Sequence, residues 1–265
     1  MKKNKHTLLW EISGKELKET SYLFGTMHVR DKKAFRSIEF LQDCILNCDA
    51  FAAEFDLQDA SHRKFHLAAR IPKKKSLEDF LNPRIYKKLD KLVKRETNCP
   101  LDDFKYSSPI ILFNVLSESQ FGKDNNMPLD NSLFKFAEQN EKTLLGLESF
   151  QAQINIFSKV DMKEQCRYLK RMTTNFNRFR KELQKSAELY IKGDIQKLVK
   201  NAKKSIGSMR KILLYDRNIT MAEKFISYAS EQRLFAAIGA GHLGGEKGVL
   251  RLLKLKGYKI IPIIY

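Results

Sequence analysis

The sequence predicts an α/β fold in which a central mixed β-sheet is flanked by helices and carries a large helical insertion. Apolar runs typical of strands recur along the chain, at 8–13, 20–24, 51–55, 143–147, 234–238 and 258–265. Two regions between them, 57–122 and 151–230, have apolar residues at helical spacing. At 265 residues the chain is long enough for one substantial core. We therefore predict a single domain over 1–265, with these two helical regions inserted between segments of the sheet.

The first part of the chain predicts a hairpin followed by a parallel crossover. Residues 8–13 and 20–24 flank a short polar stretch, as two antiparallel strands do. Apolar residues at helical intervals from 34 to 47 predict a helix, and the strand at 51–55 follows it. Because strand, helix and strand come in that order, we expect the two strands to be parallel.

The middle of the chain is mostly helical by pattern. Prolines break the region 57–122 into short helices, and a further helix is predicted from Pro128 to about Asn140. The second helical region predicts long helices with breaks near Gly193 and Gly207.

The last part of the chain predicts a strand, a loop, a helix and a closing strand. Strand 234–238 leads into a glycine-rich loop, and 245–256 has the pattern of a helix that Gly257 caps. The apolar run 258–265 predicts a buried strand.

One short phrase occurs near both ends of the chain and ends in histidine each time. It reads Gly-Thr-Met-His at 25–28 and Gly-Ala-Gly-His at 239–242, and each copy directly follows a predicted strand. Loops beyond the strand ends of open α/β sheets hold polar groups on a rigid platform, where ligands collect. Two imidazoles placed in this way could share one metal ion, so His28 and His242 are candidate ligands.

A third candidate ligand is Glu54, a carboxylate within an otherwise apolar strand. A catalytic divalent metal typically has three protein ligands and one open position, and it lowers the pKa of the water bound there. His28, Glu54 and His242 supply two nitrogens and one oxygen, the ligand mix of several zinc peptidases. Such mixed ligands also suit Mn²⁺ and Co²⁺. The set favours a hydrolase.

Arg217 and Asn218 are candidate catalytic residues. The planar, permanently charged guanidinium of Arg217 can hold a substrate carboxylate or stabilise an oxyanion, and the Asn218 amide can donate a hydrogen bond beside it. The alternative interpretation is an arginine on a helix surface next to a structural asparagine.

Two further glutamates have two interpretations each. Glu148, at the end of a short strand, can be an additional ligand or general base, or it can cap a helix that starts at Ser149. Glu11 can act as an acid or base, or it can face water from an edge strand.

Gly25, Gly239 and Gly241 are candidate cofactor-binding positions, because glycine permits tight turns and the close approach of a ligand to the backbone. A phosphate-binding loop would need Lys followed by Ser or Thr, and residues 244–248 do not match it. Nucleotide binding is therefore not expected. His62 and His66 are spaced to share a helix face, but Arg63 stands where a zincin has Glu, so we expect them to be surface or core residues.

Several segments together resemble one known family. They are residues 8–12, 25–28, Glu54, 129–130, 147–148 with Gln153, 190–194, 217–218 and 239–245. Over nearly its whole length the chain is similar to the TraB/GumN family, which includes the Tiki-type proteases. The resemblance implies a fold similar to that of the erythromycin esterase (EreA) and ChaN-like proteins.

The same resemblance implies a metal-dependent hydrolase that acts on peptide or protein bonds. His28, Glu54 and His242 would bind the metal, and Arg217 would address the substrate. The resemblance favours Mn²⁺ or Co²⁺ over Zn²⁺. The alternative is a non-catalytic module that captures a peptide or a peptide-derived signal in the same cleft.

The charge of the chain points to acidic partners. The net charge is +18, and the segment 159–211 has 16 basic against 5 acidic residues, a net of +11. Such an excess attracts acidic proteins, anionic membranes and nucleic acid. Helical spacing makes its aromatic residues candidates for the core rather than for base stacking, so nucleic acid is not the expected partner. The alternative is a solvated helix face without a partner.

Cysteine usage and the amino terminus indicate a reducing compartment. The four cysteines have no Cys-x-x-Cys spacing, and Cys44 and Cys48, one helical turn apart, are expected to be buried small residues rather than zinc ligands. Only three apolar residues follow the basic start before Glu11, too few for an export signal, and no apolar run is long enough for a bilayer span. A cytoplasmic location is expected, with non-classical secretion as the alternative.

Overall fold

The computed structural model describes residues 6–14, 17–55, 69–71, 74–122 and 124–265. His62 and His66 lie outside the described residues. Contacts divide the chain into two compact units. Unit 1 comprises Met1–Asp59, Gly122–Phe150 and Ser186–Tyr265, and unit 2 comprises Ala60–Phe121 and Gln151–Lys185. The single domain over 1–265 stays a prediction.

Unit 1 contains a mixed sheet, as the sequence predicts. Its described strands are β1 (Leu9–Ser13), β2 (Ser21–Thr26), β3 (Ala50–Phe55), β4 (Thr143–Glu148), β5 (Leu234–Gly239) and β6 (Lys259–Ile263). They lie in the order β4-β3-β5-β2-β1-β6. β1 is antiparallel to both β2 and β6, which confirms the hairpin, whereas β2, β5, β3 and β4 are mutually parallel. The crossover from β2 to β3 is therefore parallel, with β5 between the two strands.

The parallel strands end together at one edge of the sheet. Thr26 pairs with Gly239 across β2 and β5, and Phe55 pairs with Glu148 across β3 and β4. We call this edge the carboxyl edge. The side chains that follow or end these four strands are thereby placed at one side of the sheet.

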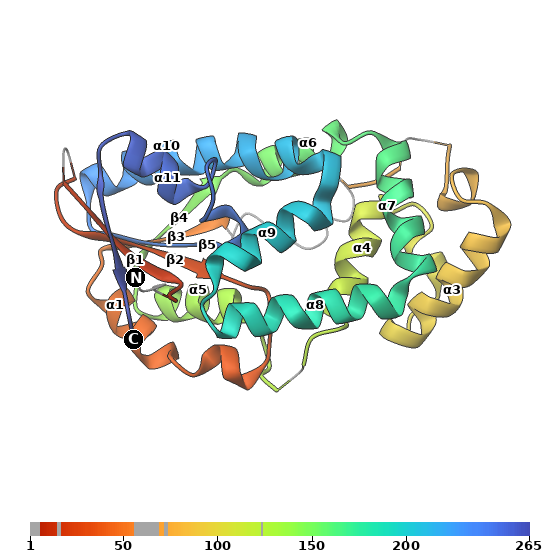
Figure 1. Ribbon diagram of the computed structural model, residues 1–265, viewed down its shortest axis with the longest axis horizontal. Helices are drawn as coiled ribbons and strands as arrows, with labels where there is room; N and C mark the ends of the chain where they lie inside the picture. The colour runs from red at the N-terminus through yellow and green to blue at the C-terminus, as the bar shows by residue number, and fades with distance from the viewer. Residues whose placement is uncertain (1–5, 15–16, 56–68, 72–73, 123) are drawn as a thin grey trace. The chain divides into compact units, whose positions relative to one another are not determined.

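Helices cover both faces of the sheet. On one face α1 (Ile38–Leu46) and α5 (Leu129–Gln139) pack against Phe51 and Phe235. On the other, α10 (Asp216–Glu231) and α11 (Val249–Leu255) pack against Ala52 and its neighbours (Figure 1). Phe51 and Ala52 serve opposite layers because successive side chains of a strand point to opposite faces.

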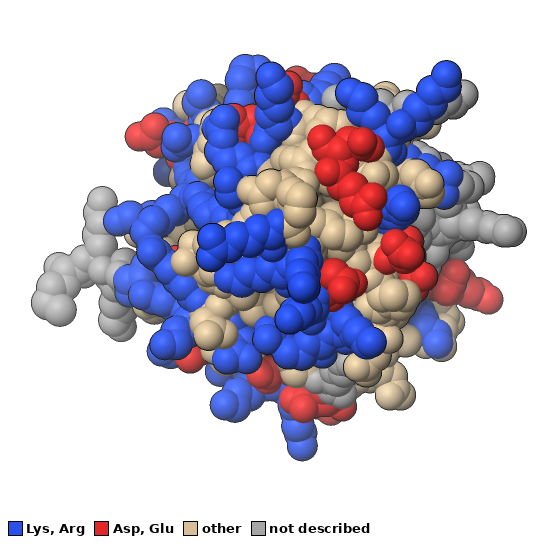
Figure 2. All heavy atoms as spheres, turned by 90° about the vertical axis from the view of Figure 1, so that its right-hand side faces the viewer, with Lys and Arg blue, Asp and Glu red and all other residues tan. Residues whose placement is uncertain are grey.

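Unit 2 is helical and has a core of its own. Its described α-helices are α3 (Pro83–Thr97), α4 (Pro109–Glu118), α7 (Met162–Thr174), nearly all of α6 (Phe150–Lys159) and the first part of α8 (Phe176–Ile191). Leu89, Leu112 and Leu169 are fully buried in this core. Figure 2 shows the face that carries α3 and α7, where Lys and Arg side chains predominate.

The predicted breaks in the second helical region are confirmed. Gly193 separates α8 from α9 (Ile195–Ile206), and Gly207 ends α9. Both glycines have positive φ, +68° and +54°, a conformation that side chains with Cβ rarely adopt.

Two helix starts and the burial of one strand differ from the sequence-based expectation. The predicted helix at 34–47 is a 3₁₀ turn (Lys32–Phe35) followed by α1, which begins at Ile38. The predicted helix at 245–256 begins only at Val249, because a turn with Gly245 at φ +87° precedes it. The closing strand β6 is half-buried rather than buried, because it lies at the edge of the sheet and pairs with β1 alone. No helix among the described residues is long and apolar enough to cross a bilayer.

Candidate functional site

His242 lies just past the end of β5, in a 3₁₀ turn formed by Ala240–His242. It is 6% exposed, and its Nδ1 lies 2.6 Å from Oδ1 of Asn218 on α10. The Asn218 amide nitrogen donates to the carbonyl of Lys247 at 2.6 Å, which leaves Oδ1 as the acceptor. His242 Nδ1 therefore carries the proton, and Nε2 presents a lone pair.

The surroundings of His242 keep its ring neutral. Burial, and next the charge of Arg217, lower the pKa of His242 to about 4, although the nearby Glu54 opposes this shift. At neutral pH, Nε2 is thus unprotonated and faces Arg217 Nη1 at 3.4 Å, a contact that a metal ion or a proton at Nε2 would replace.

Glu54, the next-to-last residue of β3, lies beside the first residue of the second histidine loop. Its Oε1 accepts the backbone N–H of Gly239 at 2.6 Å, and its Oε2 accepts Nη2 of Arg217 at 2.8 Å. Burial by itself raises the pKa of Glu54, but the charge of Arg217 and the hydrogen bonds from the Gly239 amide and Arg217 outweigh it and hold the pKa at about 2. The carboxylate is therefore ionised, and Oε1 lies 3.9 Å from His242 Nε2.

Arg217 joins Glu54 to Glu148. Its Nε donates to both Glu148 oxygens at 3.1 and 2.9 Å, and its Nη2 donates to Glu148 Oε2 at 2.5 Å. The Arg217 and Glu148 side chains are only 14% and 2% exposed. Burial lowers the pKa of Arg217, but the two carboxylates outweigh this effect and raise it. Nη1 faces His242 Nε2 at 3.4 Å, so a buried cation lies between two carboxylates and one imidazole.

His28 follows β2 and has a partner of its own. Its Nδ1 lies 2.9 and 3.1 Å from the two carboxylate oxygens of Asp130, in the first turn of α5. The His28 side chain is 42% exposed, in contrast to the buried His242. Asp130 is the residue at this edge that the site predictions missed. The sequence offers two signals for it: Asp130 lies two residues after the predicted start of a helix at Pro128, and 129–130 is one of the segments that carry the family resemblance.

The two histidine loops pack directly on each other at Gly25. A Cβ at Gly25 would lie 2.4 Å from Leu243 Cδ1 and 3.2 Å from Ala240 Cβ, so only glycine fits there. A Cβ at Gly239 would lie 2.7 Å from Glu54 Oε1. At Gly241 the nearest atom, Ala202 Cβ, would be 3.6 Å away, which is ordinary contact. The first two glycines thus permit close approach within the protein, whereas their predicted role toward a cofactor stays a prediction.

The predicted metal ligands meet only in part. His242 and Glu54 face each other, and His28 faces Asp130. Among the residues that the structure describes, no group of three or more His, Cys, Asp or Glu is arranged to hold one ion. A centre with His28, Glu54 and His242 around a single ion therefore stays a prediction.

Comparisons with known proteins decide the family. The model of the TraB/PrgY/gumN family matches residues 8–262. The chain belongs to this family. It is also 28% identical over 316 residues to a protein of Amphimedon queenslandica named "Metalloprotease TIKI homolog", an alignment that covers 96% of this chain and 61% of that relative. The chain thus spans about three fifths of the relative's length. No solved structure matches the chain, so the likeness to erythromycin esterase and ChaN-like folds stays a prediction.

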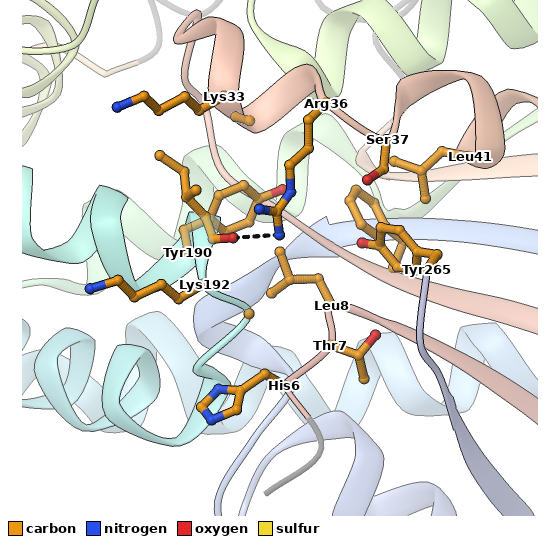
Figure 3. A pocket seen from close by; sticks show the side chains of 14 residues that line it. His6, Thr7, Leu8, Lys33, Arg36, Ser37, Leu41, Tyr190, Lys192 and Tyr265 are labelled. Atoms are coloured by element: carbon orange, nitrogen blue, oxygen red, sulfur yellow. Dashed lines mark hydrogen bonds between the residues drawn. The ribbon is translucent and has the colours of Figure 1, made fainter.

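Unit 1 also has a pocket that shares no residue with the candidate site at the carboxyl edge. It is framed by the start of α1, the turn between α8 and α9, and Tyr265 (Figure 3). Its lining contains no Asp or Glu and four basic side chains, those of His6, Lys33, Arg36 and Lys192. Arg36 Nη2 donates to the Ile191 carbonyl at 2.9 Å. The pocket has a volume of about 50 Å³, which is room for a few water molecules. The pocket therefore differs chemically from the carboxylate-rich carboxyl edge.

Proposed function

We propose that this chain is a metal-dependent hydrolase that cleaves peptide or protein bonds at the carboxyl edge of its sheet. His28, Glu54 and His242 are the proposed ligands of one divalent ion, Mn²⁺ or Co²⁺, with Zn²⁺ as an alternative. The observation that carries the proposal is the meeting of His242 Nε2 and Glu54 Oε1 at 3.9 Å, with the His242 tautomer fixed by Asn218.

Two of the three proposed donor atoms lie within reach of one ion. Bonds from a divalent ion to histidine nitrogen and carboxylate oxygen are about 2.0–2.2 Å long, and two donors 3.9 Å apart can both make them. Glu54 meets Arg217 through Oε2 and His242 through Oε1, so metal binding at Oε1 keeps the bond from Arg217 Nη2 to Oε2. Metal binding at His242 Nε2 would replace its contact with Arg217 Nη1. When bound, the ion would supply a water of lowered pKa and would polarise the scissile carbonyl.

Residues around the proposed ligands have supporting tasks. Asn218, almost fully buried, holds the His242 ring and its proton rather than reaching toward a substrate. Glu148 holds the Arg217 guanidinium by Nε and Nη2. Nη1 remains directed to the His242 side, and we propose it as the donor that stabilises negative charge on the substrate carbonyl oxygen.

The substrate class is taken from the relative. A protein named a metalloprotease that aligns with 96% of this chain makes a peptide or protein the first substrate to test. Because the chain covers only 61% of that relative, the activity of the whole relative is a proposal for this chain.

A metal and cleavage assay tests the proposal. Protein purified without chelator is expected to retain one divalent ion per chain by elemental analysis, and to cleave members of a peptide library as followed by mass spectrometry. His242→Ala is expected to abolish both, whereas His6→Ala, a histidine outside the site, serves as the matched control. Retention of the ion with every peptide left intact would favour the non-catalytic binding module, and no ion together with an unaffected His242→Ala variant would contradict the proposal.

We further propose an acidic partner for the basic helices. The predicted basic segment 159–211 begins in unit 2, and Figure 2 shows Lys and Arg gathered on the face of α3 and α7. Exposed side chains of one sign create a field that attracts acidic polypeptides over distances near the Debye length, about 8 Å at physiological salt. An acidic protein or peptide is therefore the partner to test first.

A further inference from the structure

The two histidine loops match each other beyond the histidines themselves. His242 Nδ1 meets an oxygen of Asn218, the third residue of α10, and His28 Nδ1 meets the carboxylate of Asp130, the second residue of α5. Asp130 lies in the first turn of α5, whereas Asn218 lies where α10 continues from a π-helical turn (Lys211–Tyr215). The two helices cover opposite faces of the sheet. Each histidine thus has a hydrogen bond from Nδ1 to a side-chain oxygen on a helix, and the two helices come from different parts of the chain.

The hydrogen bonds determine where each imidazole carries its proton. An ionised carboxylate can only accept a hydrogen bond, so the contact with Asp130 requires a proton on His28 Nδ1. The contact with the Asn218 oxygen likewise requires a proton on Nδ1 of His242. When neutral, both rings therefore carry the lone pair on Nε2, the atom turned away from the helix partner.

Backbone hydrogen bonds hold the Asp130 segment against the His28 loop. The N–H of Leu129 donates to the carbonyl of Val29 at 3.0 Å, and the N–H of Asn125 donates to the carbonyl of Arg30 at 3.1 Å. The residues next to both side chains are therefore joined, and the pair does not depend on two freely moving surface side chains. This distinguishes it from an ordinary exposed ion pair, which contributes little.

We propose that Asp130 is a positioning residue that holds the Nδ1–H tautomer and the ring orientation of His28, as Asn218 does for His242. The inference rests on the proposed function, because a fixed Nε2 lone pair matters when that atom is a ligand. Metal-ligating histidines generally donate their other N–H to an oxygen of the protein, and loss of that oxygen weakens metal binding about 10- to 100-fold.

The test reads the tautomer of His28 directly. Long-range ¹⁵N–¹H NMR spectra of metal-free protein, recorded at alkaline pH, distinguish Nδ1–H from Nε2–H. Wild type is expected to show Nδ1–H at His28. Asp130→Ala is expected to lose it, whereas Asp130→Asn, which keeps an acceptor oxygen, is expected to keep it. Asp43→Ala, which removes an exposed carboxylate from α1, is the control for charge alone.

Titration with Mn²⁺ supplies the second measurement. Asp130→Ala is expected to weaken Mn²⁺ binding about 10- to 100-fold, with Asp130→Asn close to wild type. An unchanged His28 tautomer in Asp130→Ala, or Nε2–H already in wild type, would overturn the positioning role. If wild type binds no Mn²⁺ while the tautomer follows Asp130 as expected, the proposed function fails and the positioning role of Asp130 stands.

Discussion

Both compact units have a net positive charge, but they differ in the size of the excess and in the exposure of their ion pairs. Unit 2 is the smaller one, yet it has 22 Lys and Arg against 10 Asp and Glu, a net charge of +12. Unit 1 has 27 against 21, a net charge of +6. In unit 1 the ions of the candidate site are buried around Arg217, whereas in unit 2 the pair of Arg178 and Glu182 has side chains 74% and 59% exposed.

This difference separates two uses of charge. A buried ion depends on its partner, because a charge left alone in a dry site costs several kcal/mol. An exposed ion contributes little by itself, but many of one sign add up to a long-range attraction. Single substitutions should therefore be severe at the carboxyl edge and mild in unit 2, where only combined changes should have a visible effect.

Removal of the positive charge of Arg217 in unit 1 is expected to have the largest effect on stability. Arg217→Met leaves the buried Glu148 and the partly buried Glu54 without their counter-ion and should lower the free energy of unfolding by about 3–5 kcal/mol. The measurement is urea unfolding followed by circular dichroism. Arg178→Met in unit 2 is the matched control and should change the value by less than about 1 kcal/mol. Equal effects of the two variants would contradict the contrast between the units.

The substitution Gly239→Ala, which adds a methyl group in the second histidine loop, should have the next largest effect on stability. The Cβ of Gly239→Ala would lie 2.7 Å from Glu54 Oε1 and should cost about 1–3 kcal/mol by overpacking. Gly241→Ala meets its nearest atom at 3.6 Å and should be close to neutral in the same unfolding experiment. Similar losses at both positions would show that Glu54 does not approach the backbone at Gly239.

Reversal of exposed charge in unit 2 is expected to weaken binding without loss of stability. Lys91→Glu with Lys170→Glu, on the packed helices α3 and α7, should reduce affinity for poly-L-glutamate about tenfold at low salt. The control is Lys254→Glu with Lys256→Glu, two exposed lysines at the end of α11 and just after it in unit 1. Fluorescence anisotropy at increasing NaCl measures both. If the control pair weakens binding equally, net charge rather than the unit 2 face attracts the polyanion.

Thiol reactivity should follow burial rather than unit, because each unit has at least one buried cysteine. Burial raises the pKa of Cys44 and Cys166 to about 11 and that of Cys48 to about 12. Because the thiolate is the reactive form, these three should react slowly with a disulfide reagent at pH 8 and faster as the pH rises. Half-buried Cys99 should react first, and Cys99→Ser should remove the fast phase. A second fast thiol in native protein would show that one of the three is accessible.

Much of the architecture follows from local signals in the sequence. The hairpin of β1 and β2, the strand β3 with Glu54, helix α5 after Pro128, and the breaks at Gly193 and Gly207 are all as predicted, because apolar periodicity and turn residues act over a few positions. The two histidine loops are also adjacent as expected, since β2 and β5 are neighbouring parallel strands.

The pairing of side chains could not be predicted in the same way. Arg217 reaches Glu148 and Glu54 across 69 and 163 positions of sequence, and no local pattern encodes such contacts. The sequence therefore indicated Arg217 as a group that addresses the substrate, but not its place between two carboxylates. The contact of Asp130 with His28, over 102 positions, was missed for the same reason. The half-buried state of β6 depends on its place in the sheet order, which periodicity does not determine.

The most direct test of the proposed metal site is calorimetric titration of Mn²⁺ into metal-free protein. Wild type is expected to bind one ion per chain, and Glu54→Gln and His242→Ala are each expected to lose that binding while His6→Ala keeps it. Wild-type protein that binds no ion, or a His242→Ala variant that binds as wild type does, would contradict the account.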